Sequence, residues 1–94
     1  MTKLTALVES PEVATYIVLI LEELKRAEEK HPRFPKDPIH QAAVMAEESG
    51  EAVRAALQYV YEGGSLESVS TELIQTAAMC LRMLKNLPCH EKTL

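Results

Sequence analysis

Three long segments with helical spacing, divided by turn residues, most constrain what this chain can fold into. Ser10-Pro11 and Asp37-Pro38 each join an N-cap residue to a proline, which is tolerated at the first position of a helix. Gly63-Gly64-Ser65 offers a left-handed end to one helix and an N-cap to the next. The sequence therefore predicts three main helices, over residues 11–30, 38–62 and 66–86. A weaker signal predicts one helical turn within residues 1–10, and Pro88 precedes a predicted frayed tail, 88–94.

The middle of the first long segment is apolar on nearly every side. Its apolar residues are Val13, Tyr16, Ile17, Val18, Leu19, Ile20, Leu21 and Leu24. A helix of this kind is usually buried on more than one side, and one neighbour cannot cover it. Ninety-four residues suffice for one domain, 1–94, with a modest core that a partner would enlarge. We therefore expect an all-α helical bundle of three main helices per chain, completed by oligomerisation; the alternative is a monomer with a sticky core helix.

Composition disfavours several classes of function. The net charge is −4, the chain has four aromatic residues and no Trp, and no Lys/Arg stripe is present, so nucleic-acid binding is not expected. The two cysteines, Cys80 and Cys89, do not suggest a disulfide framework. Cys80 falls on a predicted apolar helix face, where buried free cysteine is common. The apolar run 16–21 is too short to cross a bilayer and no signal-peptide pattern is visible, so we expect a cytoplasmic protein.

Two acidic motifs lie on the second and third predicted helices. The first is Glu47-Glu48-x-x-Glu51 and the second is Glu72-x-x-Gln75. Residues three or four apart share a helix face, and like charges there cost roughly 0.2–0.5 kcal/mol per pair. A hard divalent cation supplies a reason for the arrangement, because Mg²⁺ is held by carboxylates together with substrate phosphates. The alternative is that these glutamates form a solvated helix face.

These two motifs resemble the EExxE and ExxD signature of the all-α NTP pyrophosphatases called MazG-like. The resemblance extends over roughly residues 33–84 and includes Phe34-Pro35, Asp37-Pro38-Ile39-His40, and Ala77-Ala78 through Leu81-Arg82. One position departs from the family pattern, since Gln75 stands where the family usually has Asp.

The resemblance implies both a fold and an activity. The fold would be a MazG-like four-helix bundle assembled as a homodimer or homotetramer, with the base pocket between chains. The activity would be Mg²⁺-dependent pyrophosphohydrolysis, with Mn²⁺ as a substitute: a (d)NTP is converted to a (d)NMP and pyrophosphate, in a house-cleaning role for the nucleotide pool. By the family pattern the metal ligands are Glu48, Glu51, Glu72 and Gln75. The catalytic residue is Glu47, which would bind a second ion or orient the attacking water.

Two basic residues are candidates for binding substrate phosphate. Arg82 lies two turns beyond Gln75 on nearly the same side of the helix, and Lys36 lies in the loop that precedes the acidic helix. The alternatives are a surface ion pair for Arg82 and ordinary loop solvation for Lys36. Gly50, in the middle of a helix, costs about 1 kcal/mol relative to Ala and suggests room for a close helix or a ligand.

Two other classes of function stay open. Gln75 favours a catalytically weakened or inactive MazG-like oligomer that binds nucleotide or a protein partner. A di-iron carboxylate bundle needs a Glu-x-x-His motif from each of two helices. This chain offers that spacing once, from Glu28 to His31, so the di-iron class is disfavoured.

Overall fold

The computed structural model describes residues 2–88, and its regular elements are four helices: α1 (Thr2–Glu9), α2 (Pro11–Lys30), α3 (Pro38–Tyr61) and α4 (Leu66–Lys85). No strand occurs in this described range. The all-α class is confirmed, and the three long helices begin at the predicted residues. The weak N-terminal signal corresponds to an eight-residue helix rather than to one turn. Most of the predicted tail, residues 89–94, lies outside the described residues.

The turn residues act as caps, with one exception. Asp37 accepts a hydrogen bond from the Ile39 backbone N–H at 3.0 Å, and Ser65 accepts one from the Ser68 N–H at 3.1 Å. Ser10 makes no such bond, so the start of α2 depends on the proline that follows it. At the other end of α3, Gly63 has a φ of 73°, which a side chain would strain.

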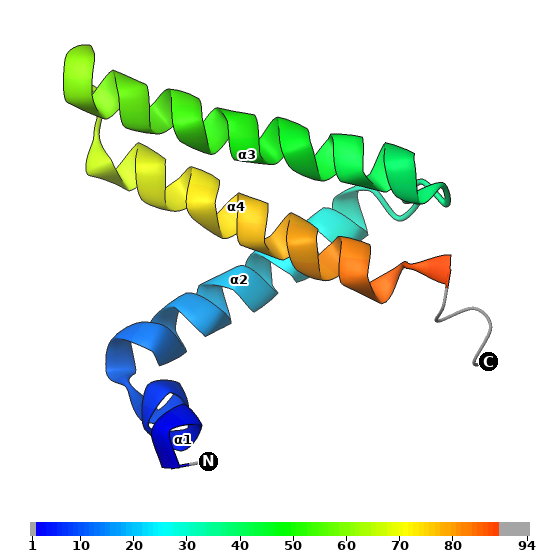
Figure 1. The fold of residues 1–94 in the computed structure, drawn as a ribbon, viewed down its shortest axis with the longest axis horizontal. Coiled ribbons are helices and arrows are strands. Elements are labelled where there is room, and N and C mark those ends of the chain that lie inside the picture. Colours follow the sequence, from blue (N-terminus) through cyan, green and yellow to red (C-terminus); the bar gives the residue numbers. More distant parts are fainter. Residues whose placement is uncertain (1, 89–94) are drawn as a thin grey trace.

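The helices form a hairpin crossed by a third helix. Figure 1 shows α3 and α4 antiparallel and side by side, with α2 crossing α4 obliquely and α1 turning away at the far end of α2. The radius of gyration is 15.4 Å, whereas a compact domain of this length would have about 12 Å. The chain therefore leaves much of each helix uncovered.

Membrane-spanning potential is limited to one bent pair of helices. No single helix within residues 2–88 is both long and apolar enough to cross a bilayer. The pair 3–9 and 11–30, bent by 70°, reaches the required length and composition only when the two helices are taken together.

The apolar stripe of α3 points away from the rest of the chain. The positions of this stripe are spaced alternately four and three residues apart. Its large apolar residues are highly exposed, with exposed fractions of 80% for Ile39, 62% for Val53, 51% for Leu57 and 64% for Val60. The side that α3 turns inward instead carries Gln41, Glu48 and Ala55, which are seven residues apart. The same reversal occurs on α4, where Leu73 and Leu84 are exposed and Cys80, expected on an apolar face of the core, is exposed as well.

The apolar core within one chain is correspondingly small. Among the described residues, the apolar side chains that are buried are Leu24, Ala55 and Ala78. The exposed surface of the chain is 7254 Å², whereas a compact monomer of 10.5 kDa exposes about 5,400 Å². A single copy thus leaves more apolar surface in water than a stable domain usually does.

Two buried polar residues hold the α2–α3 loop against α4. Gln41 is completely buried, and its Nε2 donates to the carbonyls of Pro35 at 2.7 Å and Asn86 at 3.0 Å. The Arg82 guanidinium, 4% exposed, donates to the carbonyls of Ala27, at 3.3 Å, and His31. These contacts join the end of α2 and the loop to the last turns of α4.

Arg82 makes a further contact inside this group. Its guanidinium carbon lies 4.8 Å from the centre of the Phe34 ring, close enough for a cation–π interaction. The carbonyls at the C-terminus of α2 carry partial negative charge, so a buried cation there is favourable. The guanidinium therefore fastens one helix end and one aromatic side chain to α4.

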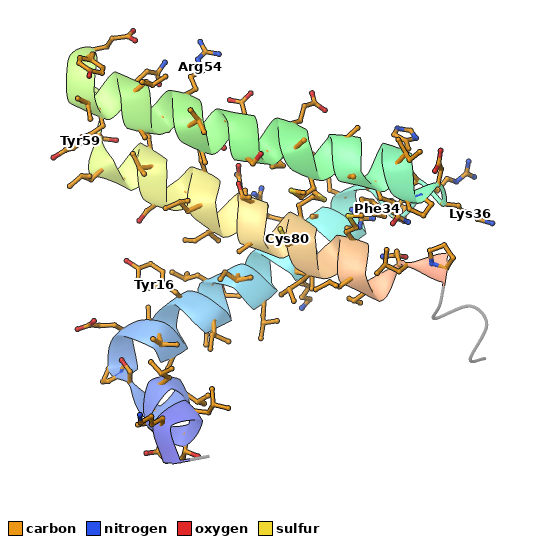
Figure 2. All side chains as sticks on the ribbon, viewed as in Figure 1. Tyr16, Phe34, Lys36, Arg54, Tyr59 and Cys80 are labelled. Carbon is orange, nitrogen blue, oxygen red and sulfur yellow. The ribbon has the colours of Figure 1, made fainter. Side chains whose placement is uncertain are left out.

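Arg82→Met keeps most of the hydrocarbon volume and removes the donors. We expect it to lower the free energy of unfolding by about 2–4 kcal/mol, because two charge-assisted hydrogen bonds and a cation–π contact are lost. For a chain of this size that corresponds to a decrease of roughly 10–20 °C in Tm by circular dichroism. Arg54→Met is the control, since Arg54 is exposed on α3 (Figure 2) and should change the stability by less than about 0.5 kcal/mol. Equal Tm values for the two variants would contradict the role assigned to Arg82.

Candidate functional site

The two acidic motifs meet where α3 and α4 touch. The Thr76 hydroxyl on α4 lies within hydrogen-bond distance of the Glu72 carbonyl, at 2.7 Å, and of the Glu48 carbonyl on α3, at 3.1 Å. This contact places the backbone of Glu48 and the backbone of Glu72 at the same level of the hairpin. Glu48, Glu72 and Gln75 are all partly buried there. The structure therefore brings both halves of the motif together.

Glu48 is partly buried and has acidic neighbours. Its pKa is raised above the ordinary value of 4.5, first by burial and then by the negative charges of Glu72, Glu51, Glu47 and Glu23. These neighbours come from α2, α3 and α4. Four further carboxylates therefore lie near enough to Glu48 to disfavour its ionisation.

Glu23 is a member of this cluster that the sequence did not identify. It belongs to the charged end of α2, where Glu22 and Arg26 also have the spacing of a helical ion pair. In the structure Arg26 pairs with Glu23 instead, at 2.7 Å and 2.9 Å to the two carboxylate oxygens. Helical spacing could not reveal this, because the crossing of α2 over α4 decides which charges turn inward.

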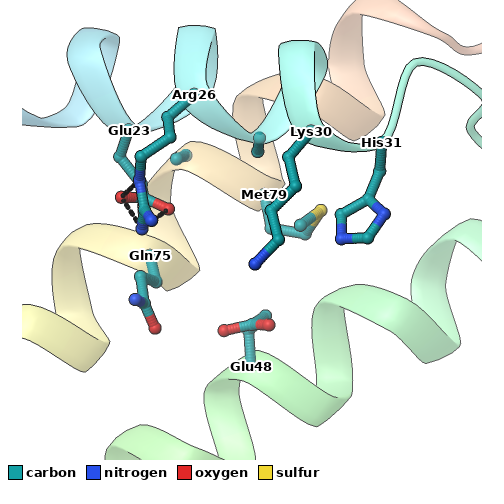
Figure 3. Close-up of a pocket in the computed structure, with 9 residues that line it drawn as sticks. Glu23, Arg26, Lys30, His31, Glu48, Gln75 and Met79 are labelled. Carbon is teal, nitrogen blue, oxygen red and sulfur yellow. Dashed lines mark hydrogen bonds and ion pairs between the residues drawn. The ribbon is translucent and has the colours of Figure 1, made fainter.

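A cavity of about 190 Å³ lies between α2 and the hairpin. Figure 3 shows Glu48 of α3 and Gln75 of α4 on one side, facing the last turns of α2 across an open space. The α2 side contributes Glu23, Arg26 and Lys30, followed by His31. The basic residues on this side were also not identified from the sequence, for the same geometric reason as Glu23.

The remaining predicted site residues lie at different distances from this cavity. Glu51 and Glu47 are exposed on the flank of α3 and act on Glu48 through their charge. Lys36 lies before the start of α3, and Glu48 lies ten residues after Pro38, the first residue of that helix. This length of helix places Glu48 about 15 Å from the end at which Lys36 lies. Figure 2 shows Lys36 at the end of the molecule beside Phe34. Arg82 directs its donors to α2 carbonyls rather than to the cavity.

Gly50 faces open space. A Cβ atom added at this position would meet nothing within 4 Å among the neighbouring atoms of the chain. The close helix approach that a mid-helix glycine suggested is therefore not made within one copy. The remaining explanations for this glycine are room for a ligand and room for a second chain.

The donor set suits a hard divalent cation. Carboxylate and amide oxygens are the ligands that Mg²⁺ and Mn²⁺ take in proteins, and a cation would relieve the repulsion that raises the pKa of Glu48. As the side chains stand, no three acidic, histidine or cysteine residues within 2–88 are close enough together to hold an ion. The glutamate side chains are long and rotatable, so we expect them to close on a cation by changing rotamer.

Comparison of the chain with protein-family models, with curated proteins and with solved structures gives no match. The family resemblance therefore depends on the motif residues of the sequence alone.

Glu48→Gln should stabilise the protein in the absence of divalent metal. A raised pKa means that folding penalises the ionised form, so the stability that Glu48 contributes is full at acid pH and is lost as the pH rises through its raised pKa. Removing one or two like-charge pairs, about 0.2–0.5 kcal/mol each, should raise Tm by roughly 1–4 °C at pH 7 with a chelator present.

The gain in Tm should disappear as the pH falls below the ordinary value of 4.5, where the wild-type carboxyl is protonated in both states. Glu22→Gln is the matched control, because Glu22 is exposed on α2 and is not among the charges that act on Glu48. A Glu48→Gln protein that is less stable than wild type at pH 7 without metal would count against a repulsive cluster.

Proposed function

We propose that this protein is a Mg²⁺-dependent nucleoside triphosphate pyrophosphohydrolase that converts a (d)NTP to a (d)NMP and pyrophosphate. The observation that carries the proposal is the crowding of carboxylates from both motifs around Glu48, beside a cavity. The resemblance to the MazG-like family supplies the reaction. The contacts of the Thr76 hydroxyl with the carbonyls of Glu48 and Glu72 support the expected proximity of the two motifs.

Each motif residue has a role in this proposal. Glu48, Glu51 and Glu72 would provide charged oxygen ligands, and Gln75 would provide a neutral amide oxygen. Bound Mg²⁺ neutralises phosphate charge and lowers the pKa of a coordinated water. Glu47 lies on the exposed flank of α3, where its carboxylate would orient the attacking water and accept its proton. The oxygen of that water forms a bond to the α-phosphorus while the α–β anhydride bond breaks, and pyrophosphate leaves.

Gln75 also supports a second candidate, a nucleotide-binding helical oligomer with weakened or absent turnover. The amide lines the cavity together with Glu48, so the neutral residue lies at the site itself and not beside it. Such a protein would bind metal and nucleotide weakly and release little pyrophosphate. The two candidates differ in turnover and share the same site.

We also propose that the protein is a homo-oligomer, a dimer or a tetramer. The exposed surface exceeds that of a compact monomer by about 1,800 Å², well above the roughly 800 Å² that each partner buries in a standard interface. The outward stripe of α3 has the alternating spacing of a helix–helix seam. Small residues near its middle, Ala43, Ala46 and Gly50, would let a second helix approach closely.

The proposed activity is tested by pyrophosphate release from a panel of dNTPs with Mg²⁺ or Mn²⁺. We expect turnover by the wild type and a loss of about 100-fold or more in Glu48→Gln, since a metal ligand supports several kcal/mol of transition-state stabilisation. Metal and nucleotide binding without any pyrophosphate release would favour the second candidate instead.

Gln75→Asp should tighten Mg²⁺ binding about tenfold or more in a calorimetric titration, because a charged ligand replaces a neutral one. Gln58→Asp is the control for added negative charge, since it lies ten residues, about 15 Å, from Glu48 on the same helix. Equal affinity of wild type and Gln75→Asp would show that residue 75 is not a ligand.

Leu57→Glu should dissociate the oligomer, because it places a charge on the outward stripe of α3, near the C-terminal end of that helix. We expect light scattering with size-exclusion chromatography to show a dimer or tetramer for wild type and a dissociation constant raised by about 100-fold or more in the variant. Gln58→Glu, at the next residue and off the stripe, should leave the mass unchanged. A monomeric wild type at micromolar concentration would contradict this assembly.

A further inference from the structure

The α2 wall of the cavity beside Glu48 carries the Glu23–Arg26 ion pair and the additional positive charge of Lys30. Figure 3 shows the Lys30 side chain reaching from the end of α2 towards Glu48, with the His31 ring beside it. Across the open space lie Glu48 and Gln75. The Lys30 ammonium forms no ion pair with Glu48, so the two charges face each other with a gap between them.

Three other basic side chains near the end of α2 already have partners. Arg26 pairs with Glu23, Lys85 pairs with Glu28 at 2.8 Å, and Arg82 donates to backbone carbonyls. Within residues 2–88, Lys30 has no hydrogen bond or ion pair. It is therefore the cation on this wall that remains available to a ligand.

The fold fixes the position of this wall. Arg82 holds the carbonyls of Ala27 and His31, which precede and follow Lys30, and the Lys85–Glu28 pair joins the same turn of α2 to α4. The helix that anchors the turn, α4, also carries Glu72 and Gln75. The separation between the basic and acidic walls is thus set by contacts within the chain and not by a mobile loop.

We propose that Lys30, assisted by His31, binds the outer phosphates of a metal-bound polyphosphate chain. A free anion entering the cavity would be repelled by Glu48 and its carboxylate neighbours, and a lone cation would be repelled by Lys30. A metal–polyphosphate complex satisfies both walls, because its cation faces the carboxylates and its phosphate oxygens face the ammonium. The inference rests on the proposed function for its cation, and it adds a residue that neither acidic motif contains.

The proposal has a thermodynamic consequence. Metal and polyphosphate should bind with positive coupling, each raising the affinity for the other. Lys30 should contribute to the affinity for the complex and oppose the binding of metal alone. A substitution of Lys30 should therefore change the two affinities in opposite directions. A lysine that only supports the fold would not have this effect.

The experiment is calorimetry on the full chain with two probes, Mn²⁺ alone and a preformed Mn²⁺–tripolyphosphate complex. We expect Lys30→Gln to weaken binding of the complex about tenfold or more and to leave binding of Mn²⁺ alone unchanged or tighter. Lys25→Gln is the matched control, because Lys25 is exposed on the same helix and does not line this cavity. Lys30 is exposed, so circular dichroism should show unchanged folding in both variants.

Equal affinity of wild type and Lys30→Gln for the complex would overturn the inference, and so would a wild type that does not bind the complex. Pyrophosphate release from dNTPs is measured on the same preparations. If Lys30→Gln loses affinity and the wild type shows no turnover, the proposed hydrolase activity is refuted and the phosphate-binding role of Lys30 stands. If the wild type shows turnover and Lys30→Gln has an unchanged KM, the role of Lys30 is refuted and the proposed hydrolase activity stands.

Discussion

The burial of Glu48 beside like charges is the physical feature from which the candidate site follows. Glu48 occupies the inward side of α3, a position that a self-sufficient hairpin would give to an apolar residue. Burial and four like charges act against its ionisation, and the Thr76 contact keeps the two acidic helices in register at that level. We propose that a bound divalent cation compensates for this arrangement.

The second constraint is the reversed polarity of the hairpin. On α3 the apolar stripe faces water while Gln41, Glu48 and Ala55 face the neighbouring helix. The polar inward side is fastened by specific hydrogen bonds, such as those of Gln41, and by the buried guanidinium of Arg82. The apolar outward side is exposed in one chain. One chain therefore builds this region from polar contacts, and the proposed assembly would cover the apolar side chains that it leaves exposed.

The sequence predicted the elements well because their ends are determined locally. The caps and prolines at Asp37-Pro38 and Ser65 mark helix starts through interactions within a few residues, so the starts of the long helices were predicted correctly. Local spacing also places the residues of each acidic motif on one side of their own helix, since residues three or four apart share a face whatever surrounds the helix.

The directions of the helix faces could not be predicted in this way. Periodicity shows that α3 has an apolar side but not whether that side meets α4, water or another chain. The inward turn of Glu23 and Lys30 depends on the angle at which α2 crosses α4, and the burial of Arg82 depends on the carbonyls of a helix end some fifty residues away. These are long-range contacts, which the residue types of one helix do not determine.

Anomalous diffraction from crystals soaked in Mn²⁺ would show whether Glu48 and Glu72 share one cation. We predict an anomalous peak between α3 and α4, with oxygens of Glu48 and Glu72 at about 2.0–2.3 Å from the ion. Crystals without such a peak, in which these carboxylates extend into solvent away from each other, would contradict it.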